Sequence, residues 1–245
     1  MEFSIAIPSY KRKALFEKNT YALLKQYGLL HLATVFINTE DEAEYTQLPG
    51  VSVVVRDCKT LTERRDFIYS YYLEGHHIFQ MDDDISKIID LTRQPVPSLK
   101  DVIERGFRVA LEEGCRLWGI YPVANPFFMK EGHRTTLSYI PGVMFGLIKK
   151  GDTIIPPEGK CDFYTSCWYY KQDGKVVRLQ DISPIANYYT APGGRLAISN
   201  GRMNEEKEGA EKVVKDFPDW ATLYIRKRTG NPEIRLREKK AVNKK

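Results

Sequence analysis

Three consecutive aspartates, Asp82, Asp83 and Asp84, follow an apolar run at residues 77–81. Carboxylates at positions i and i+2 beyond a strand lie on one side of the chain, so Asp82 and Asp84 can share a divalent cation while Asp83 points elsewhere. Oxygen ligands of this kind suit Mg²⁺ or Mn²⁺, which complete their shells with water and substrate phosphates. Such a metal neutralises the charge that develops on a leaving diphosphate. The alternative is a solvated acidic turn that caps the next helix.

A second polar stretch, PSYKR at residues 8–12, follows the first apolar run of the chain. The hydroxyl of Ser9, the ring of Tyr10 and the cation of Arg12 are of the types that hold the base, ribose and phosphate of a nucleotide, with Pro8 at the start of the stretch. The same five residues also suit an ordinary surface turn with solvated cations.

Arg64 and Arg65 fall in the first turns of an expected helix at residues 60–75. Cations there oppose the helix dipole unless an anion lies near them. We expect one of the two to form a salt bridge with the body or face water, and the other to reach a phosphate or one of the aspartates.

Asp162 is a single carboxylate in the aromatic stretch CDFYTSCWYY. A carboxylate in a partly apolar pocket can serve as general base toward a hydroxyl. The structural alternative is a helix cap, in which Asp162 or Glu158 begins the helix that follows.

The first third of the chain alternates expected strands with helix-length segments. The strands fall at residues 3–8, 33–37, 51–55 and 77–81, with helices at 9–28, 41–47 and 60–75 between them. This β-α-β-α-β-α-β order predicts an α/β fold with a mostly parallel, doubly wound (Rossmann-like) central sheet and helices on both faces. Ligands bind at the carboxyl ends of such strands, so residues 8–12 and the aspartates are expected on the same side of the sheet.

The second half is less regular. We expect helices at residues 98–114 and 204–217, and a loop leading into a helix at 156–174. Residues 116–125 are expected to form a strand that runs into a polar loop, and residues 137–151 a strand broken by Pro141 and Gly142. Further strands are expected at 175–180 and 184–191, and a hairpin at 221–237. Residues 1–225 are predicted to form one domain, followed by a basic C-terminal hairpin and tail at 226–245.

Composition limits the classes of function. The chain of 245 residues has ordinary apolar and charged content and no apolar run approaching the roughly 20 residues that span a membrane. The N-terminus lacks the order of a signal peptide, and the four cysteines form no CxxC pair, which favours reduced thiols. We therefore expect a cytoplasmic protein with no membrane partner.

Positive charge gathers at the end of the chain. Residues 226–245 carry nine Lys or Arg against two Glu, a balance of +7, while the whole chain is +5. Such a segment fits contact with phosphate backbones, since neutralised phosphates release counterions. A solubilising, frayed terminus has the same composition.

The sequence resembles the GT-A class of nucleotide-sugar glycosyltransferases. The resemblance lies in IAIPSYKR, RRDFI, FQMDDDIS and KCDF taken in this order, and it spans roughly residues 3–225. Within that class the pattern looks most like the TET/JBP-associated glycosyltransferases of phages and large DNA viruses, which are thought to attach sugars to hydroxymethylated pyrimidines in DNA.

The resemblance implies roles for individual residues. Asp82 and Asp84 match the DxD carboxylates that hold the metal and sugar nucleotide, and Asp162 matches the later acidic residue that serves as base in inverting members. Pro8, Ser9, Tyr10 and Arg12 match the loop that contacts the nucleotide. One departure is that many metal-dependent members add a late histidine ligand, whereas this chain has no histidine after His133.

The resulting prediction is a metal-dependent hexosyltransferase. It would use Mn²⁺ or Mg²⁺ and a nucleotide-sugar such as UDP-glucose, with hydroxymethylcytosine or hydroxymethyluracil in DNA as acceptor, in the cytoplasm of a host cell. One alternative is a GT-A enzyme that acts on a glycan, lipid or small metabolite. The other is a nucleic-acid-binding module without catalytic activity.

Overall fold

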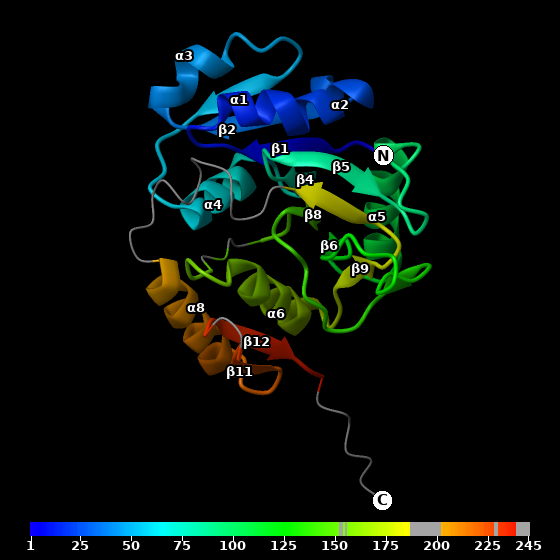
Figure 1. Cartoon of the computed structure of the whole chain (residues 1–245), viewed down its shortest axis with the longest axis vertical. Helices are drawn as coiled ribbons and strands as arrows, with labels where there is room; N and C mark the ends of the chain where they lie inside the picture. Colours follow the sequence, from blue (N-terminus) through cyan, green and yellow to red (C-terminus); the bar gives the residue numbers. More distant parts are fainter. Residues whose placement is uncertain (152–153, 155, 187–201, 228–229, 239–245) are drawn as a thin grey trace, which may run out of the picture.

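The computed structural model describes residues 1–151, 154, 156–186, 202–227 and 230–238. Its centre is an eight-stranded sheet in the order β3-β2-β1-β4-β8-β6-β9-β7 (Figure 1). The strands are β1 (Ser4–Pro8), β2 (Ala33–Ile37), β3 (Ser52–Val55), β4 (His77–Met81), β6 (Leu117–Gly119), β7 (His133–Arg134), β8 (Met144–Ile148) and β9 (Val177–Leu179). The mixed α/β fold with a large, mostly parallel sheet is as predicted.

The first four strands of this order, β3 to β4, run parallel. Beyond them β8 lies antiparallel between β4 and β6, β9 pairs parallel with β6, and β7 closes the edge antiparallel to β9. Because β1 and β4 are adjacent and parallel, the chain that follows Pro8 and the chain that follows Met81 leave the sheet at the same edge. The predicted meeting of the two polar stretches is therefore confirmed.

Helices cover both faces. One face carries a nearly continuous helix made of α1 (Lys13–Phe16), the π-turn η1 (Glu17–Tyr21) and α2 (Ala22–Gln26), together with α5 (Leu99–Glu112). The other carries α4 (Leu61–Tyr71) and α6 (Cys161–Asp173). Alternation along β1 supplies both cores, since Ile5 and Ile7 pack on the first face and Ala6 on the second. Short segments complete the body: η2 (Leu30–Leu32), η3 (Thr39–Asp41) and α3 (Glu42–Tyr45).

Two helices begin where their sequences predict. The Thr60 hydroxyl accepts a hydrogen bond from the Glu63 amide at 3.2 Å, and the Ser98 hydroxyl accepts one from the Asp101 amide at 3.2 Å. Each hydroxyl satisfies one of the amides that a helix N-terminus leaves without a partner. These caps fix where α4 and α5 start.

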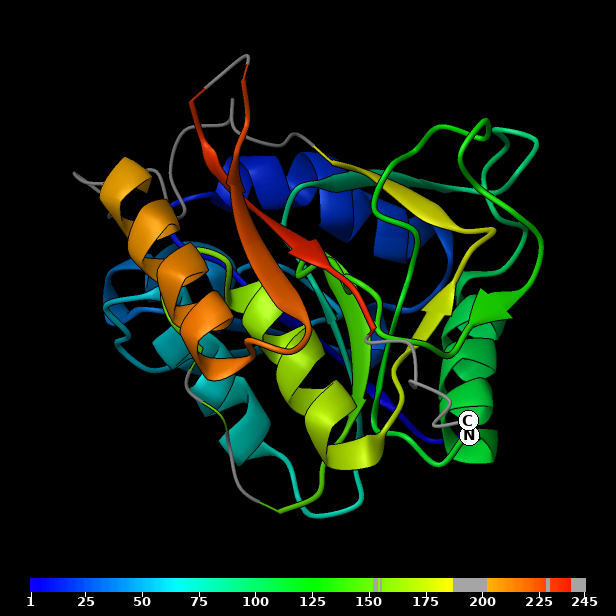
Figure 2. The same ribbon diagram turned by 90° about the horizontal axis from the view of Figure 1, so that it is seen from below.

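The C-terminal elements form a further layer outside α6 (Figure 2). Helix α8 (Arg202–Asp216) and the hairpin of β11 (Ala221–Ile225) and β12 (Pro232–Leu236) share a third apolar cluster with α6. The expected division at residue 225 falls between these two paired strands. Ile234 of β12 is buried in the cluster, so the described part of the basic segment packs on the body.

Several expected elements differ in the structure. The aspartates are followed by the strand β5 (Ile85–Ile89), which pairs with β10 (Ser183–Ala186), so the prediction of an acidic turn capping a helix is wrong. Within 116–125 the strand is β6 and the chain then enters a loop, as expected; within 137–151 the strand is β8, which begins after the expected break at Pro141 and Gly142. The part of the expected strand at 184–191 that follows residue 186 lies outside the described residues.

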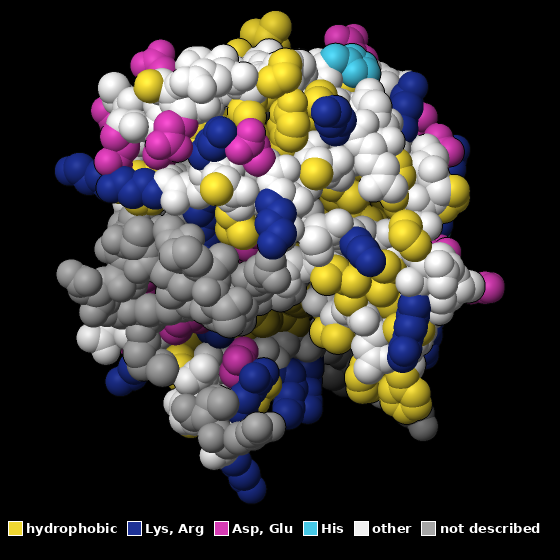
Figure 3. All heavy atoms as spheres, turned by 45° about the horizontal axis from the view of Figure 1, so that its top comes forward, with side chains coloured by type: hydrophobic (Ala, Val, Ile, Leu, Met, Phe, Trp, Pro, Cys, Tyr) yellow, Lys and Arg dark blue, Asp and Glu magenta, His cyan; other side chains and the backbone are white. Residues whose placement is uncertain are grey.

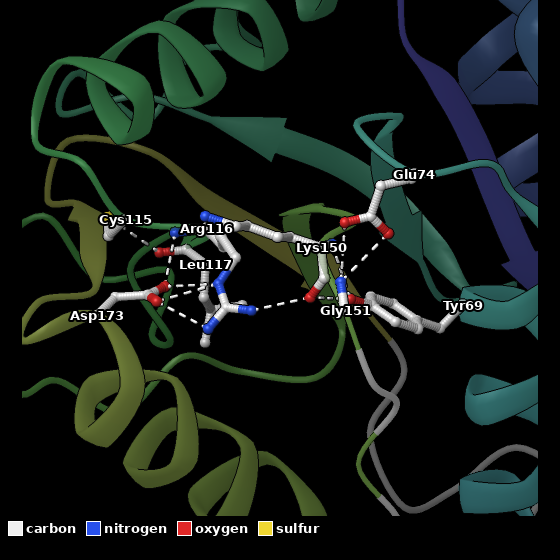
Figure 4. A network of polar contacts seen from close by, with 8 residues as sticks. All are labelled: Tyr69, Glu74, Cys115, Arg116, Leu117, Lys150, Gly151 and Asp173. Atoms are coloured by element: carbon white, nitrogen blue, oxygen red, sulfur yellow. Dashed lines mark hydrogen bonds and ion pairs between the residues drawn. The ribbon is translucent and has the colours of Figure 1, made fainter.

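A polar network ties α4 and α6 to the edge of the sheet opposite the aspartates (Figure 4). The Arg116 guanidinium, just before β6, donates to both carboxylate oxygens of Asp173 at the end of α6 and to the Lys150 carbonyl. The Tyr69 hydroxyl of α4 donates to the Lys150 carbonyl and accepts from its amide. The network fixes one end of each helix, and the opposite ends of α4 and α6 reach the carboxyl edge.

Candidate functional site

The turn that carries the three aspartates is clamped by its backbone. The Asp82 amide donates to the Val143 carbonyl at 2.9 Å. The Thr20 hydroxyl donates to the Asp82 carbonyl at 2.8 Å and accepts from the Ile85 amide at 2.9 Å. Thr20 lies in the π-turn η1, and such turns occur frequently at functional sites. Nothing in the local sequence marks Thr20 for this role.

Asp83, which the sequence left without a specific role, points inward and joins the two polar stretches. It accepts hydrogen bonds from the Ser9 hydroxyl at 2.5 Å and from Arg12 Nη1 at 3.3 Å, and it is 4% exposed. Ser9 also shares a hydrogen bond of 2.6 Å with the buried Tyr45 hydroxyl. The middle aspartate therefore holds the loop after β1 against the turn after β4.

Asp82 and Asp84 lie to either side of it, each beside a guanidinium. Arg65 Nη2 is 3.6 Å from Asp82 Oδ1, and Arg12 Nη1 is 3.7 Å from Asp84 Oδ2. The side chain of Asp82 is 34% exposed and that of Asp84 is 10% exposed. The aspartates and cations that the sequence singled out are therefore brought together at one place.

Burial governs the ionisation of this cluster. It raises the pKa of Asp82 to about 7 and the pKa of Asp83 to about 6, while the nearby guanidiniums act in the opposite direction. Burial also raises the pKa of Asp84. Two cations at more than 3 Å leave part of the cost of burying three carboxylates without compensation.

The loop after β1 has an unusual backbone. Lys11 adopts a φ of +52°, a left-handed backbone conformation that residues other than glycine rarely take. Its amide donates to Asp41 Oδ2 at 3.0 Å, and its ammonium lies 2.9 Å from Glu40 Oε2 and over the Tyr10 ring. Pro8 is the last residue of β1, so the turn begins at the edge of the sheet.

The two neighbouring arginines of α4 have separate positions. Arg64 is 5% exposed and donates to the carbonyls of Ile37 and Arg56 and to the Asn38 side chain, at the ends of β2 and β3. It does not reach the aspartates. Arg65 takes that place, as one of the two was expected to do.

Arg65 links the aspartates to the first turn of α6. Its Nη2 donates to the Gly142 carbonyl at 2.7 Å, and its Nη1 donates to Cys161 Sγ at 3.3 Å. A Cβ atom at position 142 would lie 2.7 Å from Arg65 Nη1, so the glycine permits this close approach. The guanidinium thus stands between Asp82 and residue 161.

Asp162 lies in the first turn of α6 beside Arg65. Its carboxylate accepts a hydrogen bond from the Tyr139 hydroxyl and one of 3.0 Å from the Phe163 amide. Neither Asp162 nor Glu158 is the cap, which corrects that alternative: the helix begins after Lys160, which has a φ of +58° and makes no side-chain cap. Asp162 therefore lies at the carboxyl edge with its carboxylate oriented by Tyr139 and the Phe163 amide.

The segment before Asp162 is held from two sides. The Glu158 carboxylate accepts from the amide of Thr62 at 3.0 Å, and Lys160 Nζ lies 3.0 Å from Glu206 of α8 and 3.4 Å from Glu233 of β12. The C-terminal layer therefore helps to position the start of α6, and no local sequence signal revealed this.

The donor set fits a divalent cation. Asp82 and Asp84 are two carboxylates on either side of Asp83, and the charge of Asp84 contributes to raising the pKa of Asp82. Within the described part of the chain, no three Asp, Glu, His or Cys side chains gather as a metal site. A cation held by two carboxylates would take its remaining ligands from water and phosphate, as Mg²⁺ and Mn²⁺ commonly do.

Two further observations concern the described residues as a whole. In the described residues no helix is both long and apolar enough to cross a membrane. On the face drawn in Figure 3, the Lys and Arg side chains of the described residues are interspersed with acidic and apolar ones.

Comparison with solved structures gives the fold class. TarS of S. aureus in complex with UDP-GlcNAc is similar over 89% of this chain and 66% of that chain, with 12% identity and a TM-score of 0.60. Mannosyltransferase PcManGT from Pyrobaculum calidifontis, in complex with GDP-Man and Mn²⁺, is similar over 88% of this chain and 63% of that chain, with 10% identity and a TM-score of 0.57. The chain has a GT-A-like fold. It spans slightly less than two thirds of the length of these neighbours.

No protein-family model matches the chain, and no curated protein matches it. At identities of 10–12% the neighbours establish the fold alone. The chemistry has to be argued from the residues at the carboxyl edge.

Proposed function

We propose that the protein is a nucleotide-sugar glycosyltransferase. The observation that carries the proposal is the cluster of Asp82, Asp84 and Arg65 with Asp162 at one edge of a GT-A-like sheet. The TarS and PcManGT structures were solved with UDP-GlcNAc and with GDP-Man and Mn²⁺, which supports a nucleotide-sugar donor and a divalent metal.

The proposed reaction is a direct displacement. Asp162 accepts the proton of the acceptor hydroxyl, the hydroxyl oxygen forms a bond to the anomeric carbon, and the bond from that carbon to the diphosphate oxygen breaks with its electrons leaving on the nucleoside diphosphate. A Mg²⁺ or Mn²⁺ ion held by Asp82 and Asp84 would supply positive charge to that diphosphate. Tyr10 and Arg12 contact the nucleotide, while Pro8 ends the strand beneath them and the buried Ser9 anchors the loop to Asp83.

In this scheme Asp83 and Arg64 position neighbouring elements and do not contact the substrate. Asp83 holds Ser9 and Arg12 in position through its two hydrogen bonds. Arg64 keeps the ends of β2 and β3 together beside the nucleotide loop.

The acceptor in this proposal is a hydroxymethylated pyrimidine in DNA. The support is the resemblance to the TET/JBP-associated glycosyltransferases of phages and DNA viruses, which would act in the cytoplasm of the host cell, and the basic C-terminal segment. A single modified base would enter the site flipped out of the duplex.

The test is to incubate the protein with UDP-glucose, UDP-GlcNAc or GDP-mannose, Mn²⁺ or Mg²⁺, and duplex DNA containing 5-hydroxymethylcytosine or 5-hydroxymethyluracil. Mass spectrometry of the digested DNA should find the mass of one sugar added to the modified base, and none on unmodified DNA. Sugar transfer to free sugars or lipids, but not to the DNA, would identify a different acceptor. Duplex binding without use of any nucleotide-sugar would identify a non-catalytic module.

The contribution of the C-terminal segment is tested separately. Truncation after Glu238 removes four lysines and keeps the bond from the Leu137 amide to the Glu238 carboxylate. Duplex affinity should fall, and the slope of log K against log salt should become shallower by up to about 0.9 for each lost phosphate contact. Unchanged binding at every salt concentration would argue for another acceptor.

A further inference from the structure

A pocket extends inward from the site, between α4, α6 and the second face of the sheet. Its lining includes Arg65, Asp66, Gln80, Phe145, Leu147 and Asp162. The walls are largely apolar, yet several polar side chains line them. Pockets with apolar walls and a few placed polar groups are typical of sites for small molecules.

Gln80 is the most unusual residue of this pocket. It lies in the central strand β4 and is 3% exposed, in register with Ala6 of β1 and Phe145 of β8. Its Oε1 atom is buried and has no hydrogen-bond partner within the described part of the chain. An unsatisfied buried polar atom costs about 1–3 kcal/mol, so an apolar residue would be expected at this position if packing alone mattered.

Two more buried atoms that have no hydrogen-bond partner among the described residues belong to side chains that line the same pocket. They are Oδ1 of Asp66 and Nε of Arg65. Gln80 and Asp66 each present an oxygen that accepts, whereas Arg65 presents an N–H that donates. A ligand that satisfies all three atoms must both donate and accept hydrogen bonds within one pocket.

Hydroxyl groups on a sugar ring have this property, and the apolar faces of the ring suit the walls. The pocket also lies where a donor sugar would be required, because it is lined both by Arg65, which lies beside Asp82, and by Asp162. We propose that one hydroxyl-bearing edge of the transferred sugar enters this pocket, and that Gln80 and Asp66 are specificity-determining residues for the donor. This proposal rests on the proposed glycosyltransferase function.

The test uses Gln80→Met, which keeps an unbranched side chain of similar length and removes the amide. Titration calorimetry compares UDP-glucose, UDP-GlcNAc and GDP-mannose with UDP and GDP, on the wild-type protein and on the variant. We expect the variant to bind UDP and GDP as the wild type does, and to lose about tenfold in affinity for the sugar nucleotide that the wild type prefers. Gln47→Met makes the same chemical change at an exposed residue. It should alter neither the affinity for the free nucleotides nor the affinity for the sugar nucleotide.

A second measurement does not depend on the folding of the variant. Deoxy analogues of the preferred donor, bound to the wild-type protein, should include at least one that binds about tenfold more weakly than the parent. The proposal would be overturned if all the analogues bound with equal affinity. It would also be overturned if the Gln80→Met variant bound the parent donor as tightly as the wild type does; the pocket would then hold only water. If the wild type binds no nucleotide or nucleotide-sugar at all, the proposed function itself has failed.

Discussion

Replacement of Asp162 by Asn gives the most direct test of the proposed chemistry. The substitution keeps the shape of the side chain and removes its capacity to accept a proton at neutral pH. Asn can still hydrogen-bond with the Phe163 amide and the Tyr139 hydroxyl, which rotates to suit its partner. The helix should therefore remain in place, with a cost of about 0–1.5 kcal/mol from rearranged hydrogen bonds.

The expected loss of rate is much larger than the loss of stability. A positioned general base contributes about 10²–10⁴ in rate, which corresponds to about 2.7–5.5 kcal/mol of activation free energy. The melting temperature should fall by no more than about 6 °C, since each kcal/mol shifts a domain of this size by about 2–4 °C. The predicted signature is a large fall in kcat with nearly unchanged donor affinity and melting temperature.

The assay is a single-turnover measurement of sugar transfer with the donor and acceptor that the wild type uses. Asp216→Asn is the matched control, because Asp216 also accepts a hydrogen bond from a tyrosine, Tyr164, but lies on α8 away from the site. The control should keep the wild-type rate. A rate within about threefold of the wild type for Asp162→Asn, or a product whose anomeric configuration is retained by NMR, would refute the role of Asp162 as base.

Three other substitutions separate metal binding, stability and the placement of Arg65. Asp84→Asn should abolish Mn²⁺-dependent turnover while leaving the thermal transition intact, and near-wild-type activity across a Mn²⁺ titration would reject the metal role. Asp173→Asn removes the carboxylate from a partly buried ion pair with Arg116, so the free energy of unfolding in denaturant should fall by about 1–3 kcal/mol, and an unchanged unfolding midpoint would contradict this. Gly142→Ala would place a Cβ 2.7 Å from Arg65 Nη1 and so displace the guanidinium. Calorimetry should find donor binding weaker by about tenfold or more, at a melting temperature similar to that of the wild type. Equal donor affinity would mean that Arg65 does not contact the donor.

Local sequence signals carried much of the fold. The caps at Thr60 and Ser98 lie where a hydroxyl precedes an acidic residue by three positions, because that spacing satisfies amides within a single turn of helix. The site residues after β1 and β4 were predictable for a related reason: parallel neighbouring strands end at one edge, so residues distant in sequence meet there.

Other parts of the site had no local signal. The choice between Arg64 and Arg65 depends on which face of α4 turns toward the aspartates, and that is decided by how the helix packs on the sheet. Thr20 contacts the aspartate turn through a π-turn that the helical pattern did not reveal. Lys160 is fixed by Glu206 and Glu233, which arrive from elements far along the chain.

The sequence by itself determined the α/β order, the helix starts and the acidic and basic groups available at the strand ends, because these follow from spacing and side-chain chemistry within a few residues. Only the tertiary structure decided that Asp83 faces inward to Ser9 and Arg12, and that the buried Oε1 of Gln80 has no hydrogen-bond partner in the residues that the structure describes. The physical reason is that burial and hydrogen-bond satisfaction depend on the elements packed around a residue, and those come from distant parts of the chain.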